Sequence, residues 1–344
     1  MKAGIVGSPQ TGKTTLFRLL TQAKEDASHR SSGQNVGVMD IPDERVLWLS
    51  SIFNPERTVF AKLDIVDIHA HKGQEFLNSV RNLDALIVVI GAFMDGEGSA
   101  ASCAFIDDME TEFFVADLAS VEGRLERLSS RKAKPVNQME VPFLEKCKSA
   151  LDGYVPLRKV DFEPYEKDFL SNFAFYTLKP IIIAVNVSED SLAGGDYPGK
   201  EGIEKISASR DYPLVIFSGA VEEEIKSLPE EERLAFLKEY GLSEPGVSRI
   251  AKAVFRCLGL ISFFTVGEDE VRAWNIREGT TAKEAAGKIH SDLERGFIRA
   301  EVVSYEDLRR LGSMKACREK GLLRLEGKDY VVKDGDIITV RFSI

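Results

Sequence analysis

The chain opens with Lys2-Ala-Gly-Ile-Val6 and continues with Gly7-Ser-Pro-Gln-Thr-Gly-Lys-Thr14. The second stretch matches G-x-x-x-x-G-K-[ST], a loop whose backbone N–H groups surround phosphate oxygens. An apolar run typical of a strand precedes it, and an amphipathic run typical of a helix follows it. The motif requires a glycine-rich loop between a strand and a helix, because the helix N-terminus then adds positive potential next to the phosphates.

This motif predicts a nucleotide site. We expect Lys13 to reach the β- and γ-phosphates and the Thr14 hydroxyl to bind Mg²⁺. The residues predicted to line the phosphates are Gly7, Gln10, Thr11, Gly12, Lys13, Thr14 and Thr15.

Further apolar runs follow along the chain. They lie at 63–66, 85–90, 181–185 and 214–217, with helical patterns between several of them. Continuous β-branched runs of this length are typical of strands buried on both faces of a parallel sheet. The sequence therefore predicts an α/β fold with a doubly wound, mostly parallel sheet.

Two strand ends supply further candidate ligands. Asp67 ends the run that starts at Leu63, where a Walker B acid would bind the Mg²⁺ side of the nucleotide. The runs at 181–185 and 214–217 are followed by Asn186-Val-Ser-Glu189 and Ser218-Gly-Ala220, where a G domain recognises the base. Guanine specificity normally comes from N-K-x-D, and here Val187 and Glu189 replace the Lys and the Asp. Adenine is then at least as plausible as guanine. The predicted base-site residues are Asn186, Val187, Glu189, Ser218, Gly219 and Ala220.

The gap between the runs at 85 and 181 is too long for one crossover connection. Within it an apolar seam repeats with spacings typical of a heptad: Phe114, Leu118, Val121, Leu125 and Leu128. We read 107–172 as an inserted, coiled-coil-like helical hairpin, with two ordinary crossover helices as the alternative.

The C-terminal part changes pattern after a helical, charged stretch at 222–258. A hairpin around Gly267, a helix over 281–290 and strands at 298–303, 329–333 and 337–342 form a compact α+β module. The predicted domains are 1–106 with 173–261, the insert 107–172, and the module 262–344.

Composition sets outer limits on the function. The chain has 344 residues and a net charge of −10, so bulk attraction to nucleic acid is excluded. The segment 262–344 is balanced, with 15 basic and 15 acidic residues, so it could contact RNA locally. No apolar run is long enough for a transmembrane helix, and four dispersed cysteines favour a reducing compartment. We expect a cytoplasmic monomer without membrane contact.

Taken together, these segments resemble the YchF/Obg-like ATPase family of TRAFAC-class P-loop NTPases. The strongest resemblance lies in 258–344, for example in Glu270-Val-Arg-Ala-Trp-Asn-Ile-Arg277 and Glu294-Arg-Gly-Phe-Ile-Arg-Ala-Glu-Val302. The resemblance implies a G domain, a helical coiled-coil insert and a C-terminal ubiquitin-like TGS domain. It also implies a preference for ATP over GTP and an association with ribosomes.

The chain departs from the family pattern at several places. Gln10 stands where the family usually has Asn, and Ala70 replaces the glycine of D-x-x-G. The switch II segment that follows is shortened, and 93–106 lacks the family's histidine for hydrolysis. Ser31 aligns with the Mg²⁺-binding Thr of switch I, which makes Thr14, Ser31 and Asp67 the predicted metal ligands. His71 is a candidate for orienting water or acting as general base, with a solvated loop histidine beside Lys72 as the alternative.

Three functions remain open from the sequence. The first is a YchF-like protein that binds ATP·Mg²⁺, hydrolyses it slowly and acts on the ribosome. The second is a nucleotide-tuned docking module, without significant hydrolysis, that binds ribosomal RNA or tRNA through the TGS domain and the helical arm. Its basic cluster would be Arg309, Arg310, Lys315, Arg318, Lys320 and Arg324. The third is a GTPase with relaxed base choice.

Overall fold

The computed structural model describes residues 1–21, 29–31, 34–93, 96–130, 134–135, 137–170 and 172–343. They form two compact units. The first unit comprises Met1–Gly37 and Asp64–Ile250, and the second comprises Val38–Leu63 and Ala251–Ile344. Among the described residues no helix combines the length and the apolar character needed to cross a membrane.

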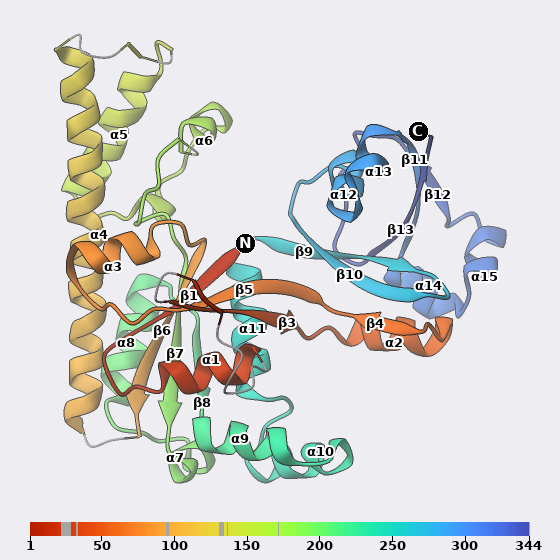
Figure 1. Cartoon of the computed structure of the whole chain (residues 1–344), viewed down its shortest axis with the longest axis horizontal. Coiled ribbons are helices and arrows are strands. Elements are labelled where there is room, and N and C mark those ends of the chain that lie inside the picture. Colours follow the sequence, from red (N-terminus) through yellow and green to blue (C-terminus); the bar gives the residue numbers. More distant parts are fainter. Residues whose placement is uncertain are drawn as a thin grey trace. The chain divides into compact units, whose positions relative to one another are not determined.

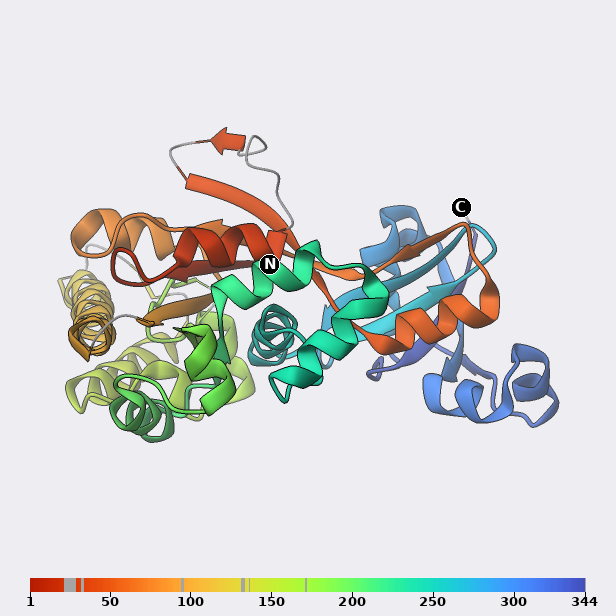
Figure 2. The ribbon, with the colours of Figure 1, turned by 90° about the horizontal axis from the view of Figure 1, so that it is seen from below.

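A seven-stranded sheet forms the centre of the first unit (Figure 1), in the order β2-β3-β5-β1-β6-β7-β8. β1 pairs in parallel with both β5 and β6, and β7 pairs in parallel with β6 and β8. β2 joins the edge antiparallel to β3 (Figure 2). The predicted strands are confirmed as β1 Lys2–Val6, β5 Ala61–Asp67, β6 Ala85–Ala92, β7 Ile181–Val187 and β8 Leu214–Phe217; the edge strands are β2 His29–Ser31 and β3 Gln34–Ile41.

Both faces of this sheet are covered. Leu86, Val88 and Ile90 of β6 share a core with α3, α4 and α8, while Ile87 and Val89 of the same strand face the other way and are equally buried. This burial on two faces explains the unbroken apolar run of β6. The surrounding helices are α1 Lys13–Thr21, α3 Gly73–Val80, α7 Glu189–Gly194, α8 Lys200–Arg210, α9 Gly219–Ser227, α10 Glu230–Glu239 and α11 Gly246–Cys257.

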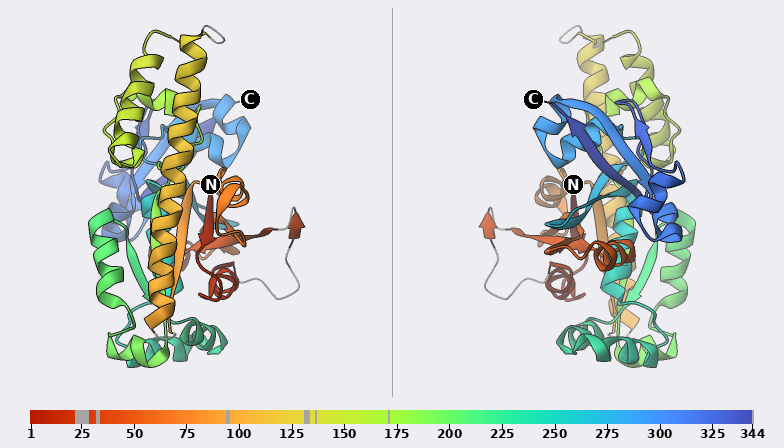
Figure 3. Two further views of the ribbon diagram at one scale, coloured as in Figure 1. Left: turned by 90° about the vertical axis from the view of Figure 1, so that its left-hand side faces the viewer. Right: turned by 90° about the vertical axis from the view of Figure 1, so that its right-hand side faces the viewer.

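The helical insert is built on one long helix, α4, which spans Gly96–Ser129 and so begins ahead of residue 107. α5 (Glu140–Asp152) lies beside one half of α4, as Figures 1 and 3 both show. The predicted apolar seam of α4 packs against this side, around buried Phe143, Leu144 and Leu151. Short segments complete the cluster with aromatic rings; they include η1 Leu157–Lys159 and α6 Pro164–Leu170.

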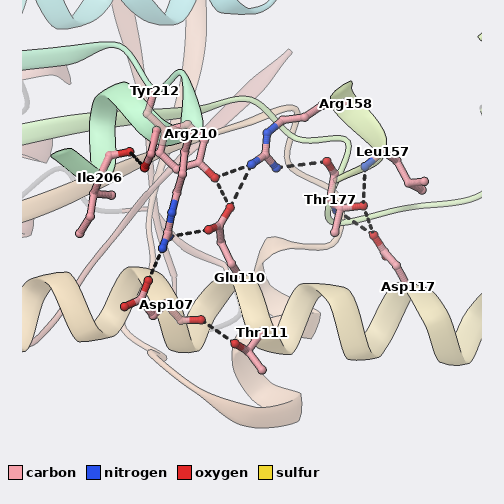
Figure 4. A network of polar contacts seen from close by, with 11 residues as sticks. Asp107, Glu110, Thr111, Asp117, Leu157, Arg158, Thr177, Ile206, Arg210 and Tyr212 are labelled. Carbon is pink, nitrogen blue, oxygen red and sulfur yellow. Dashed lines mark hydrogen bonds and ion pairs between the residues drawn. The ribbon is translucent and has the colours of Figure 1, made fainter. Parts of the chain in front are cut away.

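A polar network fixes α4 to the α/β layer (Figure 4). Glu110 accepts hydrogen bonds from Arg158 (3.0 Å), Arg210 (2.5 Å) and the Tyr212 hydroxyl. Further along α4, buried Asp117 accepts from the backbone N–H groups of Tyr176 and Thr177. Burial raises the pKa of Asp117 despite these donors. The insert is therefore anchored at its base through charged as well as apolar contacts.

The second unit holds a six-stranded sheet in the order β12-β11-β13-β9-β10-β4. The predicted hairpin around Gly267 is confirmed, since β9 (Leu260–Val266) and β10 (Glu270–Arg277) pair antiparallel. The predicted helix is confirmed as α12 (Ala282–Ile289), which starts with a capping box between Thr281 and Glu284. The other elements of this unit are α2 Glu44–Phe53, β4 Arg57–Val59, α13 Ser291–Arg295, β11 Phe297–Ser304, α14 Tyr305–Leu311, α15 Met314–Glu319, β12 Arg324–Glu326 and β13 Asp336–Phe342.

The strand predicted at 329–333 is wrong. The strand of this region is β12, which pairs with β11, while 329–333 contributes one isolated bridge between Thr281 and Val331. The backbone there bonds to the start of α12 instead, because Tyr330 O accepts from Ala282 N (2.7 Å). The Tyr330 hydroxyl donates to Asp336 Oδ2 at 2.8 Å.

Residues 38–63 group with the C-terminal module, although the sequence analysis placed them in the segment 1–106. Trp48 on α2 packs edge-on against Tyr305, with ring centroids 5.3 Å apart. Arg45 binds Asp334 at 2.7 Å and lies over the Phe264 ring. These contacts join positions that are far apart in the chain.

Candidate functional site

The loop Gly7–Gly12 connects β1 to α1 and depends on two glycines. Gly7 has φ 148°, and a Cβ there would lie 2.5 Å from the carbonyl oxygen of Val89. Gly12 has φ 94°, and a Cβ there would lie 2.3 Å from Nδ2 of Asn186. A side chain at either position would collide with a fixed neighbour, so the glycines of the motif are required by packing as well as by conformation.

Gln10 lies at the exposed tip of the loop in the left-handed region, with φ 63°. An L-residue with a Cβ costs about 1–2 kcal/mol in this conformation, and Asn tolerates it better than Gln. The family's usual Asn at this position therefore has a conformational reason, and this chain accepts some strain there.

Lys13 and Thr14 are the first two residues of α1. Lys13 bonds within the loop, and Thr14 bonds to β5. Lys13 Nζ donates to the carbonyl oxygen of Ser8 at 2.6 Å, and the Thr14 hydroxyl donates to Asp67 Oδ2 at 3.1 Å. Burial lowers the pKa of Lys13, and the nearby Asp67 carboxylate opposes that shift. We call Gly7–Thr15 together with Asp67 the phosphate side of the site, after its predicted role.

Asp67 is fully buried at the end of β5. Its Oδ2 accepts from Thr14, but its Oδ1 has no hydrogen-bond partner among the described residues. A buried carboxylate oxygen without a donor is costly, and such atoms mark places where a cation or donor binds.

The segments 186–189 and 218–220, which we call the base side after their predicted role, lie at the same edge of the sheet. Asn186 joins this side to the phosphate side, because its Nδ2 donates to Thr11 O (3.2 Å) and its Oδ1 accepts from Gly219 N (2.9 Å). Thr15 lies against the same turn, since its Cγ2 would be 3.3 Å from a Cβ on Gly219. One amide thus holds both backbone segments in place.

The other predicted base-side residues differ in exposure. Val187 is 2% exposed and packs into the core, so only its backbone faces the site edge. Ser218 is also buried, and its Oγ has no partner among the described residues. Ala220 is exposed in the first turn of α9.

Glu189 is exposed at the first position of α7, which Ser188 caps by accepting from Ser191 N. Its Oε1 accepts a hydrogen bond from the Tyr240 hydroxyl at 2.6 Å. Nothing in the sequence pointed to Tyr240, because it lies 51 positions away in a helical, charged stretch.

The loop between Asp67 and α3 is held at both ends. Ile68 N continues the sheet ladder by donating to Ile5 O (3.1 Å), and Gly73 N donates to both carboxylate oxygens of Glu112 on α4 (3.0 and 2.9 Å). Glu112 therefore caps α3, a role that the sequence analysis did not find.

His71 lies in this loop with an exposed ring, and its Nδ1 is 3.2 Å from the carbonyl oxygen of His69. Ser31, the other predicted residue of the switch regions, is in β2 and pairs with Gln34. The Ser31 side chain lies outside the described residues. Of the three predicted metal ligands, the structure therefore describes the side chains of Thr14 and Asp67.

Comparisons with known proteins cover the whole chain. Residues 260–343 match the YchF-GTPase_C family, described as a protein of unknown function (DUF933). The "Ribosome-binding ATPase YchF" of Bacillus subtilis (strain 168) is 40% identical over 100% of both chains. The protein of the same name from Escherichia coli O157:H7 is 37% identical over 100% of this chain and 99% of its own length.

A solved structure gives the same result. The YchF GTPase of Schizosaccharomyces pombe superposes with a TM-score of 0.87 and 31% identity, over 99% of this chain and 97% of that one. This similarity extends over the full length of the chain and includes the P-loop α/β sheet, the helical insert and the C-terminal β-rich module. The chain therefore belongs to the YchF/Obg-like ATPase family.

Proposed function

We propose that this protein binds ATP with Mg²⁺ at the edge formed by β1, β5, β7 and β8, and that it hydrolyses ATP slowly. The observation that carries this proposal is the Thr14–Asp67 pair at the start of α1, with one buried Asp67 oxygen left without a donor. Relatives named as ribosome-binding ATPases support the choice of ATP.

The residues present fit Mg²⁺. Hydroxyl and carboxylate oxygens are the ligands it prefers, and it commonly takes one or two protein oxygens while nucleotide phosphates and water supply the others. In keeping with this, the described residues contain no cluster of three or more His, Cys, Asp or Glu that could hold a metal by itself. Thr14 and Asp67 would hold the ion, which would neutralise charge on the phosphates.

Two features support slow hydrolysis. The loop 68–72 is short and anchored at both ends, by Ile5 and by Glu112, so it has little freedom to close over a γ-phosphate. His71, the candidate for orienting water, has an exposed ring that contacts the backbone of its own loop. Fast hydrolysis requires a positioned water and stabilisation of the transferring phosphoryl group. We expect turnover on the order of 10⁻³ s⁻¹, as in switch NTPases without an activator.

Docking on the ribosome, in the cytoplasm, is the second part of the proposal. The relatives' names suggest it, and α14 and α15 offer exposed Arg309, Lys315, Arg318 and Lys320 for RNA phosphates. The other two cations of the predicted cluster are engaged, Arg310 with Asp307 (2.6 Å) and Arg324 with Glu326 (2.9 Å).

The test is a titration with fluorescent ATP and GTP analogues, followed by phosphate release in the same samples. Lys13→Ala should weaken ATP binding by about 100-fold or more, because charge-assisted hydrogen bonds to phosphate are worth about 1.5–3 kcal/mol each. Lys205→Ala on the exposed face of α8 is the matched control and should leave binding unchanged. Equal binding by Lys13→Ala and wild type would sink the proposal, and tighter binding of GTP than ATP would replace it with a GTPase.

Co-sedimentation with ribosomes tests the docking part. Arg309→Glu combined with Arg318→Glu should lower ribosome binding about tenfold and reduce its salt dependence. Lys283→Glu combined with Lys288→Glu on α12 makes the same charge change elsewhere in the second unit. If both pairs reduced binding equally, general charge rather than α14 and α15 would be responsible.

A further inference from the structure

Tyr240, at the C-terminus of α10, contacts Glu189 of the base side. Tyr240 caps the C-terminus of α10, and its hydroxyl donates to Glu189 Oε1 at 2.6 Å. That hydrogen bond raises the pKa of Tyr240 to about 12, so the hydroxyl stays protonated and remains a donor at neutral pH. Glu189 Oε2 has no partner among the residues that the structure describes.

The position of the Tyr240 hydroxyl is set by packing. The Tyr240 ring lies against Phe236, with centroids 5.3 Å apart, and joins a small apolar cluster with Leu237 of α10. Leu192 of α7 and Val221 of α9 belong to the same cluster. After Tyr240 the chain turns through Gly241, at φ 67°, and Leu242 N bonds back to Leu237 O (2.9 Å). This packing fixes the position of the ring, and the hydroxyl therefore reaches the Glu189 carboxylate from a set direction.

The two purines make different demands on a carboxylate. Guanine presents two neighbouring donors, N1–H and N2–H₂, which pair with both oxygens of one carboxylate in a bidentate arrangement. Adenine presents the donor N6–H₂ next to the acceptor N1, so it can use only one carboxylate oxygen. Each carboxylate oxygen can accept two hydrogen bonds, so Tyr240 does not block Oε1; it competes with guanine for that oxygen and leaves Oε2 for the single donor of adenine.

We infer that Tyr240 is a specificity-determining residue, which holds Glu189 by one oxygen so that the other accepts from the 6-amino group of adenine. The inference rests on the proposed function and deepens it. Tyr240 acts through Glu189, so it is a positioning residue, and it disfavours guanine by competing for the second carboxylate oxygen. Asn186 cannot take this role, since its amide already bonds to Thr11 and Gly219.

The experiment compares the affinities of ATP and GTP, measured by displacement of a fluorescent ADP analogue. Tyr240→Phe removes only the hydroxyl and keeps the ring packing. We expect the ATP-to-GTP affinity ratio to fall about tenfold, mostly through tighter GTP binding, because the freed carboxylate gains one charge-assisted hydrogen bond to guanine. Tyr154→Phe, at an exposed tyrosine of the insert, is the matched control and should keep the wild-type ratio.

A double-variant cycle shows whether Tyr240 acts through Glu189. In a Glu189→Gln background, Tyr240→Phe should change the ratio no further. An unchanged ratio in Tyr240→Phe alone, or the same tenfold change in the Glu189→Gln background, overturns the inference. Lys13→Ala separates the role of Tyr240 from the proposed ATP binding. If ATP binding does not depend on Lys13, the proposed function and the role of Tyr240 both fail. If ATP binding depends on Lys13 but Tyr240→Phe leaves the ATP-to-GTP affinity ratio unchanged, only the role of Tyr240 fails.

Discussion

The loop Gly7–Thr15 of the phosphate side is built from residues that are close in the chain, with Asp67 joining it from 53 positions beyond Thr14, whereas the contacts of the base side all join residues that are far apart. Lys13 bonds to Ser8 within one loop, and that loop leads directly into α1. Glu189 depends on Tyr240, 51 positions away, and Asn186 holds Thr11 across 175 positions. The first arrangement is specified by a local motif, and the second exists only after the chain has folded.

This difference has a consequence for substitutions. A change on the phosphate side alters groups that would contact the nucleotide directly. A change at Asn186 or Glu189 of the base side also removes contacts between elements, so folding and binding respond together. Asn186 belongs to both sides and offers the strongest test of the distinction.

The largest effect is expected from Asn186→Ala. It leaves the buried carbonyl oxygen of Thr11 and the buried N–H of Gly219 without their partner. Each unsatisfied buried group costs about 1–3 kcal/mol, so the free energy of unfolding should fall by about 2–4 kcal/mol. Urea denaturation of the free protein measures this. ATP affinity should fall by about 100-fold, because the loop and the base turn lose their common support.

Asn78→Ala, at an exposed position of α3, is the control. Its free energy of unfolding should stay within about 0.5 kcal/mol of the wild-type value. If Asn186→Ala lost ATP affinity with unchanged stability, Asn186 would act as a direct ligand, and the two sides would not share a structural link.

An intermediate effect, confined to the phosphate side, is expected from Asp67→Asn. The neutral amide keeps a carbonyl oxygen for Thr14 but is a poor ligand for Mg²⁺. The gain in ATP affinity on adding Mg²⁺ should shrink about 10- to 100-fold, while affinity in EDTA changes little. Asp64→Asn on the same strand makes the same change at a half-buried position and should keep the full Mg²⁺ dependence. Equal Mg²⁺ dependence in both variants would remove Asp67 from the metal site.

The smallest effect is expected from Ser218→Ala on the base side. The Ser218 hydroxyl is buried without a partner among the described residues, so its removal takes away no hydrogen bond. The free energy of unfolding should stay equal or rise by up to about 1 kcal/mol, measured by urea denaturation without nucleotide. A loss of more than about 1 kcal/mol would show that the hydroxyl has a structural partner. Ser207→Ala offers the contrast, because Ser207 Oγ donates to Tyr212 O at 2.7 Å and its removal should destabilise the protein.

The sequence was sufficient for features with a local cause. The order of β1, loop and α1 follows from the motif, and the buried strands β6 and β7 follow from runs of apolar residues that suit no other element. The apolar seam from Phe114 to Leu128 likewise predicted the face of α4 that packs against α5.

Features with a long-range cause were missed. Residues 38–63 join the C-terminal module through Trp48 and Arg45, which no local pattern relates to Tyr305 or Asp334. The predicted strand at 329–333 is apolar enough for a ladder, but its backbone groups find partners at the start of α12. Tyr240 bonds to Glu189, and Glu112 on α4 bonds to Gly73; only the folded chain brings these pairs together.

The bridging amide of Asn186 also bears on how such a site can evolve. A mutation at this position would disturb the loop and the base turn at once, and a side chain at Gly12 could not replace the lost contacts, because φ 94° disfavours any residue with a Cβ. Glu189 and Tyr240 bond to each other, and within the described part of the chain neither has a hydrogen bond to the loop Gly7–Gly12. If Glu189 and Tyr240 set the base choice as we infer, substitutions at those two positions could change the preference between adenine and guanine without altering the loop Gly7–Gly12.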